Sequence, residues 1–179
     1  MEFKPRRSSP RLPSFEYRGG YAYHLILTTR ARSPRLADSS LVIACLDVLA
    51  RSAARYAFDV VAYCFMPDHL HLLVVGSDDS PLIRFVQHFK QMTGHRHPGL
   101  WQRSYYGHVL RSEEAEDVAL YIWDNPVRAG LVEDILDYAH SGPRERMLEY
   151  LGRTDNVEDR AEALSLRSAI RSDAQGGQP

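Results

Sequence analysis

The chain has 179 residues, 44% of them hydrophobic and 25% charged, which is the composition of a folded globular domain. It contains no apolar run of roughly 18 residues, which excludes an ordinary membrane-spanning helix, and its Arg-rich start lacks the apolar segment of a signal peptide. We therefore expect a cytoplasmic protein with one main domain.

Charge is divided unevenly along the chain. Residues 1–112 carry 15 Lys and Arg against 8 Asp and Glu, whereas residues 113–179 carry 7 against 15. The basic first part favours an anionic partner, with nucleic acid as the leading candidate. Uneven surface charge without any such partner explains the composition equally well.

The first half of the chain predicts an arm, a strand, a helix and a hairpin. Residues 1–18 are rich in proline, arginine and serine and predict a basic, flexible arm. The aromatic and β-branched run 21–29 predicts the first strand, and the helical period of apolar residues over 38–56 predicts a helix. Two strands at 58–66 and 69–75, separated by the turn Pro67-Asp68, predict the hairpin.

The second half predicts a helix, a strand and a further helix. Ser80 and Pro81 suit the start of a helix that runs to about Thr93. A fourth strand is expected over 106–111, and the acidic residues after it suit the first turn of a third helix, which Pro126 is expected to end.

This order, βαββαβ plus one helix, predicts an α+β fold of the ferredoxin-like type. We expect an antiparallel sheet with two helices on one face and the other face free for a ligand, and an additional helix that carries a tyrosine. Residues 19–140 are assigned to this domain, and residues 141–179 to a charged tail, helical and then flexible.

Two histidines open the third predicted strand. Residues two apart on a strand share a face and lie about 6.5–7 Å apart, so His69 and His71 can converge on one ion or phosphate. Leu70 and Leu72 then face a core. The tripeptide is common, and taken alone it fits solvated or hydrogen-bonded imidazoles better than metal ligands.

The third predicted helix adds a phenol and an amide. Tyr121 and Asn125 are four residues apart and therefore share a helix face. Taken alone, Tyr121 fits packing in an apolar helix, and Asn125, which precedes Pro126, fits a helix end.

Other chemistry-bearing residues have simpler interpretations. Tyr105 and Tyr106 are rival nucleophiles by type, but we expect them, like Trp101, to pack or to stack on bases. Asp68 could orient a histidine, although a role in the turn is favoured. Spacing gives no metal role to the remaining histidines of the first part, which are His24, His88, His95, His97 and His108. Both cysteines, Cys45 and Cys64, are expected to be reduced core residues.

Three blocks, MPDHLHLLV, WQRSYYGHVLR and YIWDNPVRAGLVE, occur in this order within residues 20–140 and resemble the REP-associated tyrosine transposases, a group of single-tyrosine HUH transposases. The resemblance implies that His69, His71 and Asn125 hold a divalent metal and that Tyr121 is the nucleophile. It also implies single-stranded DNA, in hairpin-forming repeated elements, as the substrate, and a monomer that uses its own tyrosine. Asp124 departs from the pattern, since a second Asn is frequent there, and the loop 93–100 is short.

The implied chemistry is physically reasonable. An open set of two imidazoles and an amide oxygen, without a thiolate, favours Mg²⁺ or Mn²⁺ over structural Zn²⁺. A tyrosine with an ordinary pKa of about 10 is a poor nucleophile, so metal charge or a base must assist it. Attack on phosphorus would give a covalent phosphotyrosine, which conserves the bond energy for rejoining. The resemblance implies that the link forms to the 5′ phosphate and frees a 3′ hydroxyl.

Eight basic residues are candidate phosphate contacts, although each alone also fits a solvated charge. They are Arg6, Arg7, Arg11, Lys90, Arg96, Arg103, Arg111 and Arg128. Two other functions stay open: a non-catalytic regulator that binds DNA or RNA on the same fold, and a metal-dependent phosphodiesterase that uses water and leaves no protein–DNA adduct.

Overall fold

The computed structural model describes residues 20–110 and 114–153. The chain divides into two compact units, residues 1–143 and residues 144–179. The first unit contains β1 (Ala22–Thr28), α1 (Ser39–Arg55), β2 (Phe58–Met66), β3 (His69–Gly76), α2 (Leu82–Arg96), β4 (Tyr106–Leu110), α3 (Ala115–Arg128) and β5 (Ser141–Gly142). Short 3-10 turns occur at Arg30–Arg32, Arg35–Ala37 and Ile135–Asp137.

The five strands form one sheet in the order β4-β1-β3-β2-β5, and all neighbouring strands are antiparallel. The predicted α+β fold with an antiparallel sheet is therefore confirmed. The β2–β3 hairpin is also confirmed, because Met66 pairs with His69 across the turn Pro67-Asp68. The two-residue strand β5 extends the sheet beyond β2, in a stretch that the sequence assigned to the tail.

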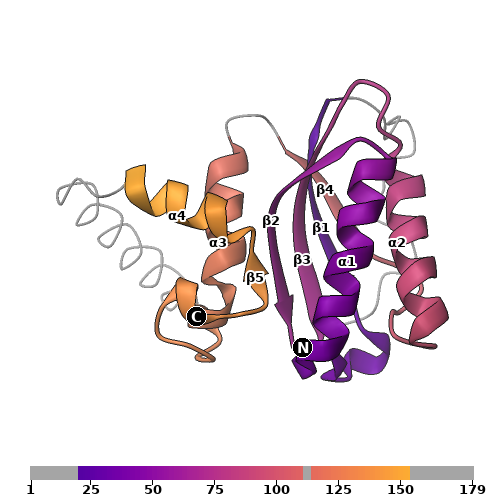
Figure 1. Ribbon diagram of the computed structural model, residues 1–179, viewed down its shortest axis with the longest axis horizontal. Coiled ribbons are helices and arrows are strands. Elements are labelled where there is room, and N and C mark those ends of the chain that lie inside the picture. Colours follow the sequence, from indigo (N-terminus) through magenta and orange to yellow (C-terminus); the bar gives the residue numbers. More distant parts are fainter. Residues whose placement is uncertain (1–19, 111–113, 154–179) are drawn as a thin grey trace, which may run out of the picture. The chain divides into compact units, whose positions relative to one another are not determined.

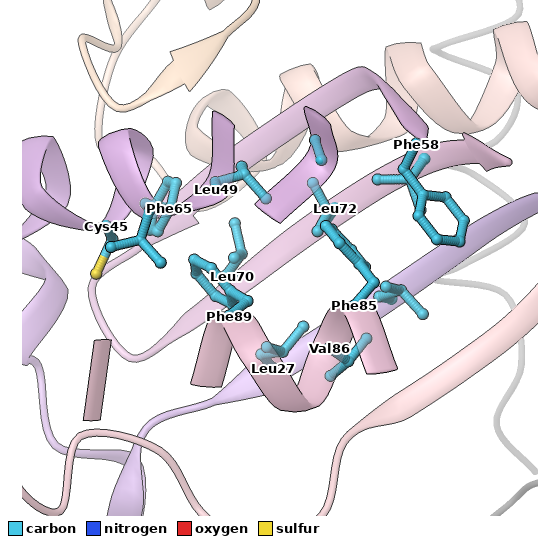
Figure 2. Packing of buried hydrophobic residues seen from close by; sticks show 14 of the residues in the cluster. Leu27, Cys45, Leu49, Phe58, Phe65, Leu70, Leu72, Phe85, Val86 and Phe89 are labelled. Atoms are coloured by element: carbon cyan, nitrogen blue, oxygen red, sulfur yellow. The ribbon is translucent and has the colours of Figure 1, made fainter. Parts of the chain in front are cut away.

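The main core lies between the sheet and the pair α1 and α2, which cover one of its faces (Figure 1). Period-2 alternation directs Leu70 and Leu72 of β3 into this core, where they meet Phe85 and Phe89 of α2 (Figure 2). These four side chains are at most 1% exposed. Truncating any one of them to alanine is expected to cost about 2–5 kcal/mol of stability.

Helix α3 contacts β2 and β3, and Figure 1 shows it on the side of the sheet opposite α1 and α2. Its buried residues Ile122 and Trp123 form the packed stripe, and the Trp123 indole N–H donates to the Gly142 carbonyl of β5 at 2.9 Å. The face that was expected to be free for a ligand is thus covered by α3 over part of its area.

The prediction that Pro126 ends α3 is wrong, because the helix continues to Arg128. Proline lacks the N–H that would bond to the carbonyl four residues earlier, which belongs to Ile122. The Asn125 side-chain amide supplies donors in this turn, to the Tyr121 carbonyl at 2.7 Å and to the Ile122 carbonyl at 3.4 Å. The second of these bonds gives the Ile122 carbonyl a donor in place of the missing proline N–H.

Both cysteines are free and buried, as expected, and burial raises the pKa of each thiol to about 12. In the second unit the described residues form α4 (Arg144–Arg153). Among the described helices, none combines the length and the apolar character needed to cross a membrane. The predicted arm of residues 1–18 and most of the predicted tail lie outside the described residues.

Candidate active site

The two histidines of β3 lie on the face of the sheet opposite the main core. His71 is 4% exposed and His69 is partly buried, while Leu70 and Leu72 point into the core. The Nε2 atoms of His69 and His71 lie 3.0 Å apart. The two side chains therefore converge, as their spacing predicts, and their Nε2 atoms are in contact.

A third histidine, His24 of β1, continues this cluster. Its Nε2 lies 3.2 Å from Nδ1 of His71, and the two ring planes differ by only 23°. His71 thus contacts His69 through one ring nitrogen and His24 through the other. We call His24, His69 and His71 the histidine cluster.

The far side of His69 is held by a carboxylate. The His69 Nδ1–H donates to Asp68 Oδ1 at 2.5 Å, and Arg32 donates to the other carboxylate oxygen at 3.0 Å. Although burial alone raises the pKa of Asp68, hydrogen bonds from His69 and Arg32 bring it below its usual value. Asp68 therefore contacts the histidine as well as standing in the turn, the role that the sequence favoured.

Arg32 reaches Asp68 from an unusual backbone conformation. Ala31 and Arg32, in the 3-10 turn that follows β1, both adopt positive φ angles, of 55° and 51°. Side chains other than glycine rarely occupy this left-handed region, and such residues are frequent at functional sites.

Burial keeps the inner rings of the cluster uncharged. Burial, with smaller contributions from the neighbouring rings His69 and His24, lowers the pKa of His71 to about 3. Burial and the nearby His108 lower the pKa of His24 to about 4. A neutral imidazole has a free nitrogen lone pair, which is the form that binds a metal.

Helix α3 brings Tyr121 to the cluster. The Tyr121 ring centroid lies 5.9 Å from that of His71 and 6.2 Å from that of His24, in edge-to-face contacts. Its side chain is 40% exposed, so the phenol is accessible to solvent. The Arg128 guanidinium carbon lies 5.0 Å from the centre of the same ring. An accessible phenol, a cation and buried imidazoles are therefore neighbours.

Asn125 lies one turn after Tyr121, on the same helix face. Among the described residues, its hydrogen bonds go to carbonyls of its own helix and not to either predicted histidine ligand. Because its nitrogen donates these bonds, its side-chain oxygen is left as an acceptor.

The residues present fit a divalent ion. The Nε2 atoms of His69 and His71 are close enough that one divalent ion could bind both. The carboxylate on His69 is a frequent partner of metal-binding histidines. In the described part of the chain, no group of three or more His, Cys, Asp or Glu side chains is arranged to hold a metal. The Asn125 side-chain oxygen, on the same helix as Tyr121, is an available ligand of another type.

The aromatic residues before β4 and in β4 separate into two roles. Trp101 and Tyr105 pack against the main core, and the Trp101 indole donates to Thr93 Oγ1 at 2.8 Å. Tyr106 is 46% exposed and pairs with Ile26 of β1, which in turn pairs with His71. Cross-strand partners share a face, so Tyr106 lies in the same row as His71.

The predicted phosphate contacts differ in their surroundings. Lys90 donates to the carbonyls of Gln102 and Arg103, at 2.7 and 2.9 Å, and so links α2 to the loop before β4. Arg96, Arg103 and Arg128 are exposed. Four others lie outside the described residues: Arg6, Arg7, Arg11 and Arg111.

Two features of this site were missed in the sequence. His24 carries no spacing signal, because its contact with His71 depends on the pairing of β1 with β3. The segment after β1 contains Arg30, Arg32 and Arg35, which follow Thr28, the strand partner of His69. These three arginines within a short segment were the available signal for a basic surface at this end of the sheet.

The chain also matches a known family. The family model "Transposase IS200 like" matches residues 18–125, which is more than half of the chain. The chain therefore belongs to the IS200-like transposase family, and the family indicated by its motifs is confirmed.

One relative of known name is similar in sequence to this chain. A Haemophilus influenzae (strain Rd) protein whose name assigns it to the REP-associated tyrosine transposases is 32% identical over 111 residues, or 51% of this chain. The match spans 62% of that relative's length.

Two solved structures are also similar. One, of a REP-associated tyrosine transposase bound to a REP hairpin, has a TM-score of 0.64 and 19% identity, and the match covers 73% of this chain and 81% of that one. The other, a Deinococcus radiodurans R1 protein described as a transposase, has a TM-score of 0.46 and 26% identity, covering 63% and 95%. The first likeness supports the fold.

Proposed function

We propose that this protein cleaves and rejoins single-stranded DNA through a covalent bond to Tyr121. The observation that carries the proposal is the contact of the Tyr121 ring with the ring of His71, 50 residues earlier in the chain, at a centroid distance of 5.9 Å. Nothing in the packing of an amphipathic helix requires an exposed phenol to lie against buried imidazoles. The family and the ferredoxin-like order of the first unit support the same chemistry.

The proposed metal site consists of His69 and His71, with the Asn125 side-chain oxygen as third ligand and Mg²⁺ or Mn²⁺ as the ion. When bound, the ion would polarise an oxygen of the scissile phosphate and offset its charge. Asp68 holds His69 by its Nδ1–H, which leaves Nε2 for the ion.

The reaction then uses side chains of this chain. Tyr121 loses its phenolic proton, and its oxygen forms a bond to phosphorus. The bond from phosphorus to the 3′ oxygen breaks, and that oxygen takes up a proton to give a free 3′ hydroxyl. Attack by a 3′ hydroxyl on the phosphotyrosine reverses these steps and rejoins a strand. Arg128, 5.0 Å from the Tyr121 ring, is placed to pair with the phosphate as it reacts.

The substrate is proposed to be hairpin-forming single-stranded DNA. The solved structure with a TM-score of 0.64 holds a REP hairpin, and the related Haemophilus protein carries the same family name. In this chain, Tyr106 offers an exposed ring in the row of His71, on which an unpaired base can stack. Arg30, Arg32 and Arg35 supply positive charge beside the end of β3 that carries His69.

We also propose that each site is complete within one chain and that the protein acts as a monomer. The contacts between Tyr121 and the histidine cluster are made inside the first unit of a single chain. No exchange of α3 between copies is then required.

A denaturing gel tests the proposal. The protein is mixed with single-stranded oligonucleotides that form a hairpin and carry a label at the 5′ or the 3′ end. A 3′-labelled fragment that stays bound to protein under denaturing conditions is expected, because the tyrosine retains the 5′ phosphate. The adduct should be absent from Tyr121→Phe, and a chelator or His69→Ala should suppress it.

The matched control is Tyr106→Phe, which removes a phenol from the same face of the sheet and keeps the stacking surface. This variant should still form the adduct. An adduct formed by Tyr121→Phe would refute the assignment of the nucleophile. Cleavage without any adduct would indicate a water-using phosphodiesterase, and hairpin binding without cleavage would indicate the regulator.

A further inference from the structure

One ring of the histidine cluster, His24, has no role in the proposed chemistry. His24 lies 3.2 Å from His71, yet it touches the nitrogen of His71 that faces away from His69. Two functions are conceivable for such a ring, as a further metal ligand or as a support for a ligand. The geometry separates them, because an ion shared by the Nε2 atoms of His69 and His71 lies on the other side of the His71 ring.

We propose that His24 is a positioning residue for the metal ligand His71: it holds the His71 ring through Nδ1, so that Nε2 stays directed at the point it shares with His69. This inference rests on the proposed metal site. Histidines that bind a metal commonly donate their other N–H to a neighbouring acceptor, which fixes both the tautomer and the orientation of the ring. For His69 the acceptor is Asp68, and for His71 it would be His24 once a metal is bound.

With all three rings neutral, the hydrogen bonds imply one set of proton positions in the metal-free protein. His69 donates its Nδ1–H to Asp68, so in the neutral ring its Nε2 has no proton and must accept. The Nε2 of His71, 3.0 Å away, then donates to it, and Nδ1 of His71 accepts. His24 consequently donates from Nε2 to Nδ1 of His71.

Metal binding would change the tautomers of two of these rings, His71 and His24. An ion needs the lone pair of His71 Nε2, so the proton of His71 must be on Nδ1. The Nε2 atom of His24 must then accept a hydrogen bond from the Nδ1–H of His71, so the proton of His24 must be on its Nδ1. His69 is unchanged, because its Nδ1–H already faces Asp68. His24 can serve both states because either tautomer presents Nε2 to His71, first as a donor and then as an acceptor.

The alternative is that His24 only fills space beside α3. It contacts the Tyr121 ring edge-to-face at a centroid distance of 6.2 Å, so removing it could disturb the nucleophile's helix without any effect on the metal. His24→Phe keeps an aromatic ring for that contact but cannot hydrogen-bond to His71. His24→Gln keeps a group that can donate or accept.

The matched control is His108→Phe. His108 is the direct strand partner of His24 on the same face of the sheet, and it is exposed. Changing it removes an imidazole from this surface without removing a hydrogen bond to His71.

The test measures metal binding in the full-length, DNA-free protein, so it does not depend on cleavage. Mn²⁺ affinity is determined by the electron paramagnetic resonance signal of the free ion, and thermal unfolding checks that each variant folds. His24→Phe should bind Mn²⁺ about 10–100-fold more weakly than the parent. His24→Gln should recover much of this loss, and His108→Phe should match the parent.

A second measurement reads the protons directly. ¹⁵N spectra of the histidine rings should show the His71 proton on Nε2 without metal and on Nδ1 with saturating Mg²⁺. The His24 proton should likewise move from Nε2 to Nδ1. Unchanged Mn²⁺ affinity in a folded His24→Phe, or an equal loss in His108→Phe, would overturn the role of His24 alone. A parent protein that binds neither Mn²⁺ nor Mg²⁺ would overturn the proposed metal site and this inference with it.

Discussion

Acidification should destabilise this protein through His71. Its pKa is lowered from 6.5 to about 3, chiefly by burial, and the side chain is only 4% exposed. A group with a depressed folded-state pKa of this kind binds its proton more readily in the unfolded chain. For a histidine, the stability that depends on the neutral ring is therefore complete above about pH 6.5 and is lost as the pH falls toward 3.

The expected size follows from these two pKa values. At about pH 5 an unfolded histidine is almost fully protonated while His71 is not, so folding loses about 2 kcal/mol from this ring relative to about pH 7.5. That is a large share of the stability of an ordinary domain, which is about 5–15 kcal/mol. His24, with a pKa of about 4, adds a loss in the same direction.

Urea unfolding at the two pH values, in the presence of a chelator, measures the effect. The quantity compared is the difference in unfolding free energy between about pH 7.5 and about pH 5. In His71→Asn this difference should shrink by about 2 kcal/mol. Leu72→Val, a neutral change on the same strand, should lower stability equally at both pH values. If His71→Asn keeps the full difference of the parent, the ring is not a source of the acid sensitivity.

Three further predictions concern other contacts. In Gly142→Ala the new Cβ would lie 2.5 Å from the Tyr63 hydroxyl oxygen, so the free energy of unfolding in urea should fall by about 1–3 kcal/mol. In the control Gly94→Ala the new Cβ meets no atom within 4 Å, so this variant should not be destabilised. Equal stabilities of the two variants would contradict the close contact at Gly142. Asp68→Asn should weaken Mn²⁺ binding by about 10–100-fold in calorimetry, because the carboxylate on His69 loses its charge, and an unchanged affinity would exclude that role. Arg128→Ala should weaken binding of a fluorescent single-stranded oligonucleotide and reduce the salt dependence of the affinity by about one phosphate contact, whereas an identical salt slope would show that Arg128 does not touch the backbone.

Local sequence patterns were sufficient for most of the first unit. The predicted second strand has the same limits as β2, Phe58–Met66, because β-branched and aromatic residues fill it and the turn Pro67-Asp68 follows directly. The predicted second helix ended at about Thr93, whereas α2 continues to Arg96. Such end residues contribute little to the apolar period from which a helix is predicted.

Features that depend on tertiary contacts escaped prediction. Strand β5 has two residues, too few for any alternation, and it exists because Ser141 and Gly142 pair with β2. The continuation of α3 past Pro126 is a different case, because the accompanying side-chain hydrogen bonds from Asn125 lie within the helix itself. A proline signal is local, and it cannot register a neighbour that supplies the missing donors.

In the candidate site, too, local features could be predicted from the sequence and long-range contacts could not. The common face of His69 and His71 follows from strand geometry, and the face of Tyr121 and Asn125 from helix geometry. The contact of His24 with His71 joins residues 47 apart, and that of Arg32 with Asp68 joins residues 36 apart. Only the pairing of β1 with β3 brings these residues together, and that register cannot be read from either strand alone.

Identification of the residue that becomes attached to DNA is the most direct test of the proposed chemistry. The protein is incubated with a hairpin oligonucleotide and a divalent ion, the adduct is digested with protease and nuclease, and the modified peptide is sequenced by mass spectrometry. A nucleotide joined through its 5′ phosphate to Tyr121 is expected. Attachment at any other residue, or the absence of a modified peptide under conditions in which the DNA is cleaved, would contradict a reaction through this tyrosine.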